Sequence, residues 1–474
     1  MVPPLVIRTH TAGGDFGRLR AEFSLPESFG PEVLAEAEAA VVDPLESAGG
    51  REDATGLPFV TIDPPGAKDL DQAVLIERVE GGGFRVHYAI ADLAAFIPPG
   101  GALDKEARRR GQTLYLPDGN VPLHPPVLSE GAASLLPGET RPAVLWTIDV
   151  DASGEPTATD VRRALVRSTE QFDYETVQAS IDAGHPHPSV AALPELGRLR
   201  RDLAIRRGAV ELQLPEQEIS GDPDGGWALI QRPRNDVDAW NAEISLLTGM
   251  AAAKIMIDAK IGVLRTLPPP DADAVEWLGR SAQALNIDWP EGKSVSEFLA
   301  ALDPGQPASM ALFADTTRLL RGAGYTAFDG ELPALTTHAG IGGAYAHVTA
   351  PIRRLVDRFA TEICLAVSAG REVPAWVRAA LSEVPEQMTA SDTLAAKVER
   401  ASIDQVEVWV MAEHIGGEFG AIVLRAEETK AEILVEDPPV MSKCTGEKLP
   451  EGERIRVRLT AVDVDKRKLS FERA

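Results

Sequence analysis

The feature that most constrains the fold is a β-type stretch near the start of the chain. Residues 59–63 and 73–79 are rich in branched and apolar side chains, and a Pro-Pro-Gly turn separates them. Three consecutive glycines from Gly81 separate the second run from residues 84–92. Two β-rich runs around a glycine cluster indicate a hairpin. Residues 149–167 continue the β-type pattern, so the early part of the chain is expected to be rich in strands.

The remainder of the chain is mainly helical and ends in short strands. Helices are predicted over residues 31–46, 240–259, 271–286, 351–369 and 393–415. Four short strands follow, at 421–424, 430–435, 454–462 and 469–472, and a run of this length fits a small OB-type barrel. We therefore expect an α+β protein with three parts: a short segment of unassigned fold (1–50), a large domain (51–413) and a C-terminal OB-fold barrel (414–474).

Composition limits the compartment and the ligands. The 474 residues contain no apolar run long enough to cross a bilayer, and the start of the chain lacks the basic and apolar regions of a signal peptide. With only two cysteines, Cys364 and Cys444, a disulfide framework is excluded and a cytoplasmic protein is expected. The net charge of −25 argues against a nucleic-acid ligand, unless a basic channel lies inside an acidic shell.

An acidic motif follows the first predicted strand. Asp63 ends that strand, and Asp69 and Asp71 are two residues apart, so an extended backbone directs both to one side. Three converging carboxylates repel one another unless a cation neutralises them, and Mg²⁺ prefers such oxygen ligands. Metal-assisted hydrolysis of a phosphodiester is the chemistry that follows. The alternative interpretation is a solvated acidic loop, which is common in a chain with 72 acidic residues.

A second motif places two arginines at the predicted start of a helix. Arg353 and Arg354 follow His347-Val-Thr-Ala-Pro351-Ile. The planar guanidinium suits phosphate oxygens, and a helix N-terminus adds positive potential. The alternative is structural, because Arg354 and Asp357 are spaced to pair along a helix.

Four ordered blocks of this sequence together resemble the RNase II/RNase R (RNB) family. The aspartate motif, Thr61-Ile-Asp63 to Asp71, is similar to that of the family, as is the arginine motif. The strand His87-Tyr-Ala-Ile-Ala-Asp92 and the stretch from Thr113 through Tyr115 to Pro137 follow in the family's order and spacing. The resemblance implies an RNB catalytic domain in which a mixed sheet and helices surround an RNA tunnel, with an RNA-binding barrel after it.

The resemblance also implies an activity and a set of site residues. The activity is processive, Mg²⁺-dependent 3′→5′ hydrolysis of RNA to nucleoside 5′-monophosphates, with Mn²⁺ as the alternative metal. Asp69, Asp71 and Arg353 would be catalytic, and the metal ligands would be Asp63, Asp69, Asp71 and Gln72. The RNA-binding residues would be Tyr115, Tyr174, Glu243, Arg353, Arg354 and Glu399, with Tyr115 stacking on a base and Tyr174 and Glu243 near the ribose 2′-OH. Tyr174 and Glu243 fit equally well as residues at the edge of the core. The expected partner is single-stranded RNA, or structured RNA with a 3′ overhang, bound by a monomer without membrane contact.

Four features depart from the family pattern. Gln72 stands where a further aspartate is usual, so metal affinity or turnover is expected to be lower. Ala350 replaces a serine, and Gly249 replaces an asparagine in the long helix. The fifty residues before the aspartate motif leave no room for the usual paired N-terminal cold-shock-type barrels, so a short form of the family is expected.

Two alternative functions follow from these departures. Gln72 and the acidic net charge favour a catalytically weak RNA-binding or regulatory protein. The missing barrels favour a metal-dependent phosphodiesterase that acts on short oligonucleotides.

Overall fold

The computed structural model describes residues 14–42, 50–210, 216–221, 226–232 and 235–474. Its main element is a six-stranded mixed sheet in the order β1-β8-β2-β3-β4-β7, and β8 also pairs with β7. The strands are β1 (Glu52–Asp53), β2 (Phe59–Ile62), β3 (Gln72–Arg78), β4 (Phe84–Ala91), β7 (Thr140–Val150) and β8 (Pro156–Phe172). The predicted hairpin is β3–β4, in which Gln72 pairs with Ile90 and Arg78 pairs with Phe84.

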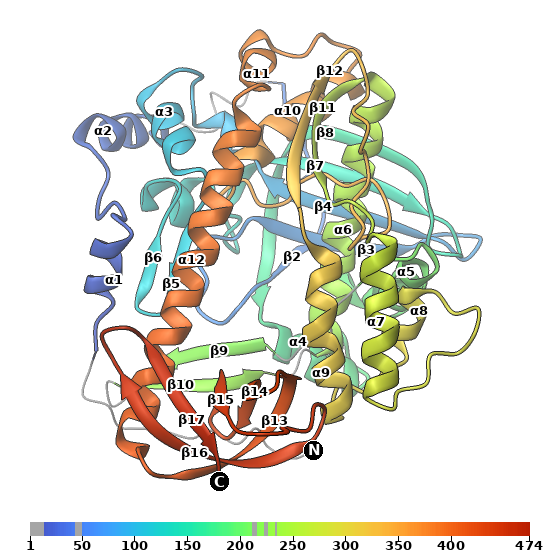
Figure 1. Ribbon diagram of the computed structural model, residues 1–474. Helices are drawn as coiled ribbons and strands as arrows, with labels where there is room; N and C mark the ends of the chain where they lie inside the picture. The colour runs from blue at the N-terminus through green and yellow to red at the C-terminus, as the bar shows by residue number, and fades with distance from the viewer. Residues whose placement is uncertain (1–13, 43–49, 211–215, 222–225, 233–234) are drawn as a thin grey trace.

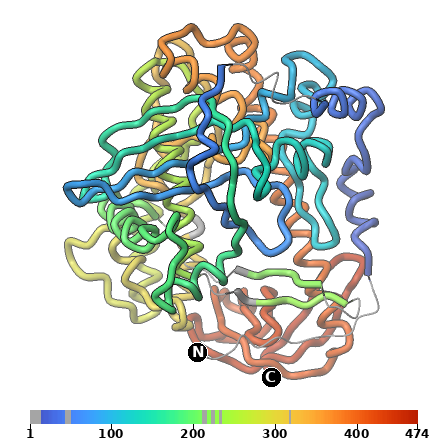
Figure 2. The backbone as a smooth tube through the Cα atoms, turned by 180° about the vertical axis from the view of Figure 1, so that it is seen from behind, coloured from blue at the N-terminus to red at the C-terminus, as the bar shows by residue number. Residues whose placement is uncertain are grey.

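Both faces of this sheet are buried, because successive strand residues point to opposite sides. Val74, Ile76 and Tyr88 belong to the large core that the long helices cover, whereas Leu75 and Ala89 belong to a second core on the other face. The helices over the first face include α4 (Tyr174–Asp182), α5 (Leu193–Arg206), α6 (Asp236–Ala259) and α10 (Leu355–Ser368). The second face is covered by α2 (Pro31–Ala40) and α3 (Ala102–Arg110). Figures 1 and 2 show the sheet and these helices from opposite sides.

The C-terminal strands form a closed barrel in the order β13-β14-β15-β17-β16, which confirms the predicted OB-type fold. The strands are β13 (Glu418–Ala426), β14 (Lys430–Glu436), β15 (Pro439–Thr445), β16 (Arg454–Asp463) and β17 (Lys468–Arg473). Strand β15 was not predicted from the sequence. It begins at Pro439, and strands tolerate a proline at their first position.

A long helix, α12 (Val384–Met411), connects the sheet domain to the barrel (Figure 1). The hairpin of β9 (Glu216–Gly221) and β10 (Trp227–Arg232) lies between the two. A helical group, α7 (Ala272–Ala284), α8 (Val295–Ala300) and α9 (Pro307–Thr316), packs against the barrel, where Arg425 Nη2 lies 2.8 Å from Asp315 Oδ1. The remaining elements are α11 (Ala375–Ala380) and the hairpins β5 (Leu114–Leu116)–β6 (Gly119–Val121) and β11 (Ile261–Thr266)–β12 (Gly324–Asp329).

A short N-terminal helix, α1 (Gly17–Glu22), is anchored at the junction with the barrel. Phe16 is fully buried, and its ring makes edge contacts with Trp227 and Trp409 at centroid distances of 5.3 Å. The guanidinium of Arg20 pairs with both Asp118 oxygens at 2.7 and 2.8 Å, which ties α1 to the β5–β6 hairpin.

Several helix boundaries differ from their predictions; α6, for example, begins at Asp236 where residue 240 was predicted. The helix predicted from residue 351 begins at Leu355, because the amides of Ala350 and Ile352 donate to the carboxylates of Asp357 and Asp71. The helix predicted over 393–415 begins earlier, at Val384. The end of the helix predicted over 31–46 falls partly outside the described residues, and α2 itself ends at Ala40. None of the helices in the described ranges is both long and apolar enough to cross a membrane.

Candidate active site

The aspartate loop, residues 63–71, connects β2 to β3 and is held from outside. Ser134 accepts a hydrogen bond from the Leu70 amide at 2.9 Å and donates to the Lys68 carbonyl at 2.6 Å. The Gln171 amide donates to the Ala67 carbonyl at 2.9 Å. These bonds fix the loop backbone and thereby the directions of its carboxylates.

The turn that carries the arginine motif lies against the end of this loop. The Ile352 amide donates to Asp71 Oδ1 at 2.8 Å, and Arg353 Nε lies 3.5 Å from Asp71 Oδ2. Asp71 is almost fully buried, whereas the Arg353 side chain is 45% exposed. No partner for the terminal nitrogens of Arg353 is found among the described residues. The Arg353 guanidinium therefore contacts Asp71 through Nε, while its terminal nitrogens remain available to bind a ligand.

Burial shapes the charge of the carboxylates. It raises the pKa of Asp63 to about 7, while Arg353 lowers that pKa and Asp69 raises it. Burial likewise raises the pKa of Asp71 to about 8, against the opposing effects of Arg353 and the Ile352 amide. Arg353 thus affects the ionisation of both Asp63 and Asp71, and Asp69 affects that of Asp63.

The donor set fits a hard divalent cation bound by few protein ligands. Asp63 Oδ2 is buried without a hydrogen-bond partner, which is costly unless a cation or a water fills the position. Among the described residues no three His, Cys, Asp or Glu side chains are grouped so that together they could hold a metal ion, so the structure does not gather the three predicted aspartate ligands into one metal site. Mg²⁺ typically uses one or two carboxylates and completes its shell with water and substrate phosphate, so Asp63 and Asp69 are suitable ligands.

Gln72 lies at the first position of β3 and faces the arginine turn. Its amide nitrogen donates to the Thr349 carbonyl. An aspartate here has no donor for that carbonyl. The glutamine therefore joins the aspartate and arginine motifs, whereas the sequence suggested only a weaker metal ligand.

Both predicted tyrosines lie beside the carboxylates. Tyr115, in the β5–β6 hairpin, is 52% exposed. Its pKa is raised above the usual range, first by partial burial and next by Asp69, which the hydroxyl contacts; Arg353 opposes this rise and Asp71 adds to it. The pKa of Tyr174 is raised by burial and next by Asp63, while a hydrogen bond with Asn241 lowers it. Both phenol rings are thus placed to contact a substrate held at the aspartates.

Three polar residues near Asp63 and Tyr174 were not predicted from the sequence: Asn241 and Ser245 on α6, and Tyr88 on β4. Ser245 forms a 2.8 Å hydrogen bond with Tyr88, and the pKa of Tyr88 is raised by burial, with Asp63 contributing. Asn241 and Ser245 are four residues apart and so lie on one face of α6. Polar residues at that spacing in an otherwise apolar helix were the signal available in the sequence.

The three other predicted RNA-binding residues, Glu243, Arg354 and Glu399, have different surroundings. Glu243 is buried on another face of α6, with Oε2 3.9 Å from the Nε of the buried Arg200, which favours the core-edge alternative. Arg354 makes two hydrogen bonds of 2.8 and 2.9 Å to Asp357, as the structural alternative predicted. Glu399 is exposed on α12.

On α12, the acidic residue Asp392 is connected to the arginine turn through Gln112. Asp392 lies 2.8 Å from Arg265 Nη1 and accepts a 3.2 Å hydrogen bond from the side chain of Gln112, whose backbone forms an isolated β-bridge with Arg354. The histidines in this region are structural, since buried His347 bonds to the Tyr325 hydroxyl at 2.9 Å. Gly249 is required by packing, because a Cβ there would lie 2.2 Å from the Tyr345 ring.

Comparison with known proteins identifies both parts of the chain. Residues 51–367 match the model of the RNB domain, and residues 417–474 match the RNase II-type exonuclease C-terminal S1 domain. Ribonuclease R of Escherichia coli (strain K12) is 27% identical over 90% of this chain, and the match spans 58% of that relative's length.

Solved structures share the fold. Mycoplasma genitalium RNase R in complex with ribose methylated single-stranded RNA superposes with a TM-score of 0.86 at 20% identity, over 96% of this chain and 77% of the other. Yeast Ssd1, described as a pseudonuclease, gives a TM-score of 0.71 at 16% identity, over 88% of this chain and 54% of the other. The expected α+β architecture with a C-terminal barrel is confirmed.

Proposed function

This chain belongs to the RNB-domain family, and from that premise we propose that it is a metal-dependent exoribonuclease. It hydrolyses single-stranded RNA, or structured RNA with a 3′ overhang, from the 3′ end, releases nucleoside 5′-monophosphates and stays bound between cuts. Mg²⁺ is the expected ion and Mn²⁺ the alternative. We further propose that it acts as a monomer in the cytoplasm, because both cysteines are buried and unpaired.

The observation that carries the proposal is the pairing of Asp71 with the partly exposed Arg353, beside Asp63, whose buried Oδ2 has no hydrogen-bond partner. Asp63 and Asp69 would hold the metal, with Asp71 and the Gln72 carbonyl as the further candidate ligands. A bound divalent ion supplies an activated water and neutralises charge on the phosphate. Arg353 binds the scissile or an adjacent phosphate and stabilises the charge that builds up there during hydrolysis. Arg354 maintains the turn through Asp357.

The tyrosines position the substrate. Tyr115 stacks on a base near the 3′ end, which suits an enzyme that tolerates any sequence. Tyr174, oriented by Asn241, contacts the terminal ribose, and this pair takes the role first assigned to Tyr174 and Glu243.

The test uses a 5′-labelled single-stranded RNA of about thirty nucleotides, long enough for several protein contacts. With Mg²⁺ or Mn²⁺, a ladder that shortens from the 3′ end is expected. Adding excess unlabelled RNA after the reaction starts measures processivity. RNA that stays intact but bound under both metals would contradict the proposal, and cleavage restricted to very short oligomers would instead support the short-oligonucleotide phosphodiesterase.

The second candidate is a catalytically weak RNA-binding protein with this fold. The observation that favours it is Gln72, whose amide is used in a contact with Thr349 where a further carboxylate was expected. The same assay separates the two candidates, because only the second predicts bound, uncleaved RNA.

A further inference from the structure

The β5–β6 hairpin that carries Tyr115 is a short sheet of only two strands. Tyr115 is paired with Asn120 in the middle of the hairpin. Leu114 and Leu116 are buried on one face, whereas Tyr115 points to the other face, where it is half exposed beside Asp69. A two-stranded hairpin is at best marginally stable by itself in water, so its position depends on what it contacts.

The base of this hairpin is fixed to the candidate active site. Thr113 donates its amide to the Arg353 carbonyl at 3.0 Å, and its hydroxyl accepts a 3.0 Å hydrogen bond from the Leu123 amide. The tip, at Asp118, is the opposite end of the hairpin, and Tyr115 lies between the two ends. With the base fixed, the position of the tip decides where the phenol ring lies.

Arg20 of α1 fixes the tip. Its terminal nitrogens donate to both carboxylate oxygens of Asp118 at 2.7 and 2.8 Å, and Nη2 also donates to the Gly119 carbonyl at 3.3 Å. The two side chains of this pair are only 24% and 26% exposed. A bidentate pair has a defined direction, because the planar guanidinium matches the plane of the carboxylate. Arg20 therefore sets the orientation of the tip as well as its distance from α1.

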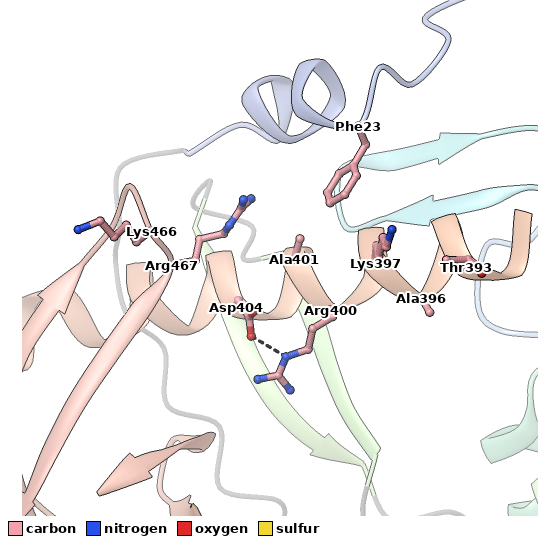
Figure 3. A pocket seen from close by; sticks show the side chains of 9 residues that line it. All are labelled: Phe23, Thr393, Ala396, Lys397, Arg400, Ala401, Asp404, Lys466 and Arg467. Carbon is pink, nitrogen blue, oxygen red and sulfur yellow. Dashed lines mark ion pairs between the residues drawn. The ribbon is translucent and has the colours of Figure 1, made fainter. Parts of the chain in front are cut away.

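Helix α1 can fix the tip because it is anchored at the junction with the barrel. Phe16 is buried against Trp227 and Trp409, and Trp227 Nε1 donates to the Gly14 carbonyl at 3.0 Å. Packing is less complete at the other end of the helix, where a pocket of about 670 Å³ lies between Phe23, α12 and the β16–β17 turn (Figure 3). The ion pairs made by the last turn of α1 are therefore important for holding this end in place.

We propose that Arg20 is a positioning residue for the substrate. Through Asp118 it holds the β5–β6 hairpin so that the Tyr115 ring meets a base near the 3′ end of the RNA. The proposal rests on the proposed function for the base contact of Tyr115. It gives a role to α1, which belongs to the segment whose fold the sequence left unassigned.

The experiment compares Arg20→Ala with Arg18→Ala in the Asp71→Asn background, in which the RNA stays intact. Arg18 lies on the same helix, but its side chain is 84% exposed and pairs with Asp465 of the barrel. Hydrogen–deuterium exchange is measured for the amides of residues 114–121 without RNA. Fluorescence is measured with single-stranded RNA that carries 2-aminopurine as its last or next-to-last base, because stacking quenches this base.

In Arg20→Ala the hairpin amides should exchange several-fold faster, and the 2-aminopurine should be less quenched than in the Arg18→Ala control. The loss of quenching should be smaller than in Tyr115→Ala, which lacks the ring. Arg20→Lys should restore only part of the quenching, since an ammonium group lacks the planar fork. Arg20→Ala/Asp118→Ala should be no worse than Arg20→Ala, because both residues act through one contact.

Hairpin exchange in Arg20→Ala at the level of the Arg18→Ala control would overturn the proposal. So would faster exchange with unchanged quenching, because Arg20 would then stabilise the hairpin without placing the ring. Melting curves verify that every variant is folded at the temperature of the assay. If Tyr115→Ala itself leaves the quenching unchanged, the base contact of the proposed function is wrong, and the exchange data alone decide whether Arg20 positions the hairpin.

Discussion

The backbone amide of Ile352 donates a hydrogen bond of 2.8 Å to Asp71 Oδ1, although 281 residues separate the two positions. This bond and the nearby Arg353 place the aspartate and arginine motifs in one site. A substitution at Asp71 therefore keeps the hydrogen bond from Ile352 only if the new side chain has an oxygen acceptor.

Asp71→Asn meets that requirement. Its side-chain carbonyl can still accept from Ile352, while the ionisable carboxyl group beside Arg353 is lost. We expect turnover on labelled RNA to fall by at least about a hundredfold, as for removal of a main electrostatic group, while RNA binding is retained. Asp149→Asn, which alters a surface pair with Arg85, is the matched control. Wild-type turnover in Asp71→Asn would show that the site is wrongly assigned.

The adjacent arginines should respond differently to alanine. Arg353→Ala should reduce kcat by about 10²-fold with little change in stability, because its side chain is partly exposed and its free end faces the site. Arg354→Ala leaves the buried Asp357 carboxylate with the Ala350 amide but without its cation, so we expect a loss of about 3–5 kcal/mol in unfolding free energy. Kinetics and urea unfolding of both variants measure this difference, and equal stability losses would contradict it.

Gln72→Asp tests the departure in the aspartate motif. An added carboxylate increases the attraction for a cation, so the Mg²⁺ concentration needed for half-maximal activity should fall. The same change removes the bond to Thr349 and should cost about 1 kcal/mol of stability. A metal titration followed by a thermal melt measures both effects. An unaltered metal requirement would argue against a cation near this position.

Discrimination between RNA and DNA should depend on Tyr174 and Asn241. Tyr174→Phe removes the hydroxyl that contacts Asn241, so the ratio of kcat/KM for RNA over DNA of the same sequence should fall several-fold. Glu243→Gln should leave this ratio unchanged, since Glu243 lies beside Arg200. If Glu243→Gln lowered this ratio more than Tyr174→Phe did, Glu243 would be the residue near the ribose 2′-OH, as the sequence first suggested.

Glu407 should make the stability of the junction with the barrel depend on pH. This buried carboxyl accepts hydrogen bonds from the Met441 amide at 3.1 Å and from Gln217 at 3.0 Å, and burial raises its pKa to about 7. The unfolded chain ionises near the ordinary value of 4.5, whereas the folded protein keeps the proton until about pH 7. Stability is therefore lost as the pH rises from 4.5 to 7, and the penalty is constant above that.

Glu407→Gln keeps the acceptor oxygen and removes this penalty. We expect its unfolding free energy to exceed that of the parent by about 1–3 kcal/mol at pH 8, with the difference vanishing near pH 4. Urea unfolding at the two pH values is the measurement, and Glu386→Gln, exposed on the same helix, is the control. A gain that is equal at both pH values would exclude ionisation as its cause.

The sequence predicted those parts of the site that depend on local pattern. The strand–turn–strand around Asp63 and the proximity of Asp69, Asp71 and Arg353 could be expected from spacing and from the family resemblance. The late start of α10 could not, because the amides of Ala350 and Ile352 are used by carboxylates that local periodicity does not reveal. Asn241 was missed for a similar reason, since its role depends on Tyr174 from another helix.

Arg18, in helix α1, lies 3.1 Å from Asp465, which is 447 residues further along the chain. Phe16 likewise reaches its place only when Trp227 and Trp409 are both available. Contacts across so large a sequence separation form late, because the chain between them must first be ordered. We therefore expect α1 to reach its final place late in folding, after α12, the β9–β10 hairpin and the barrel have been ordered.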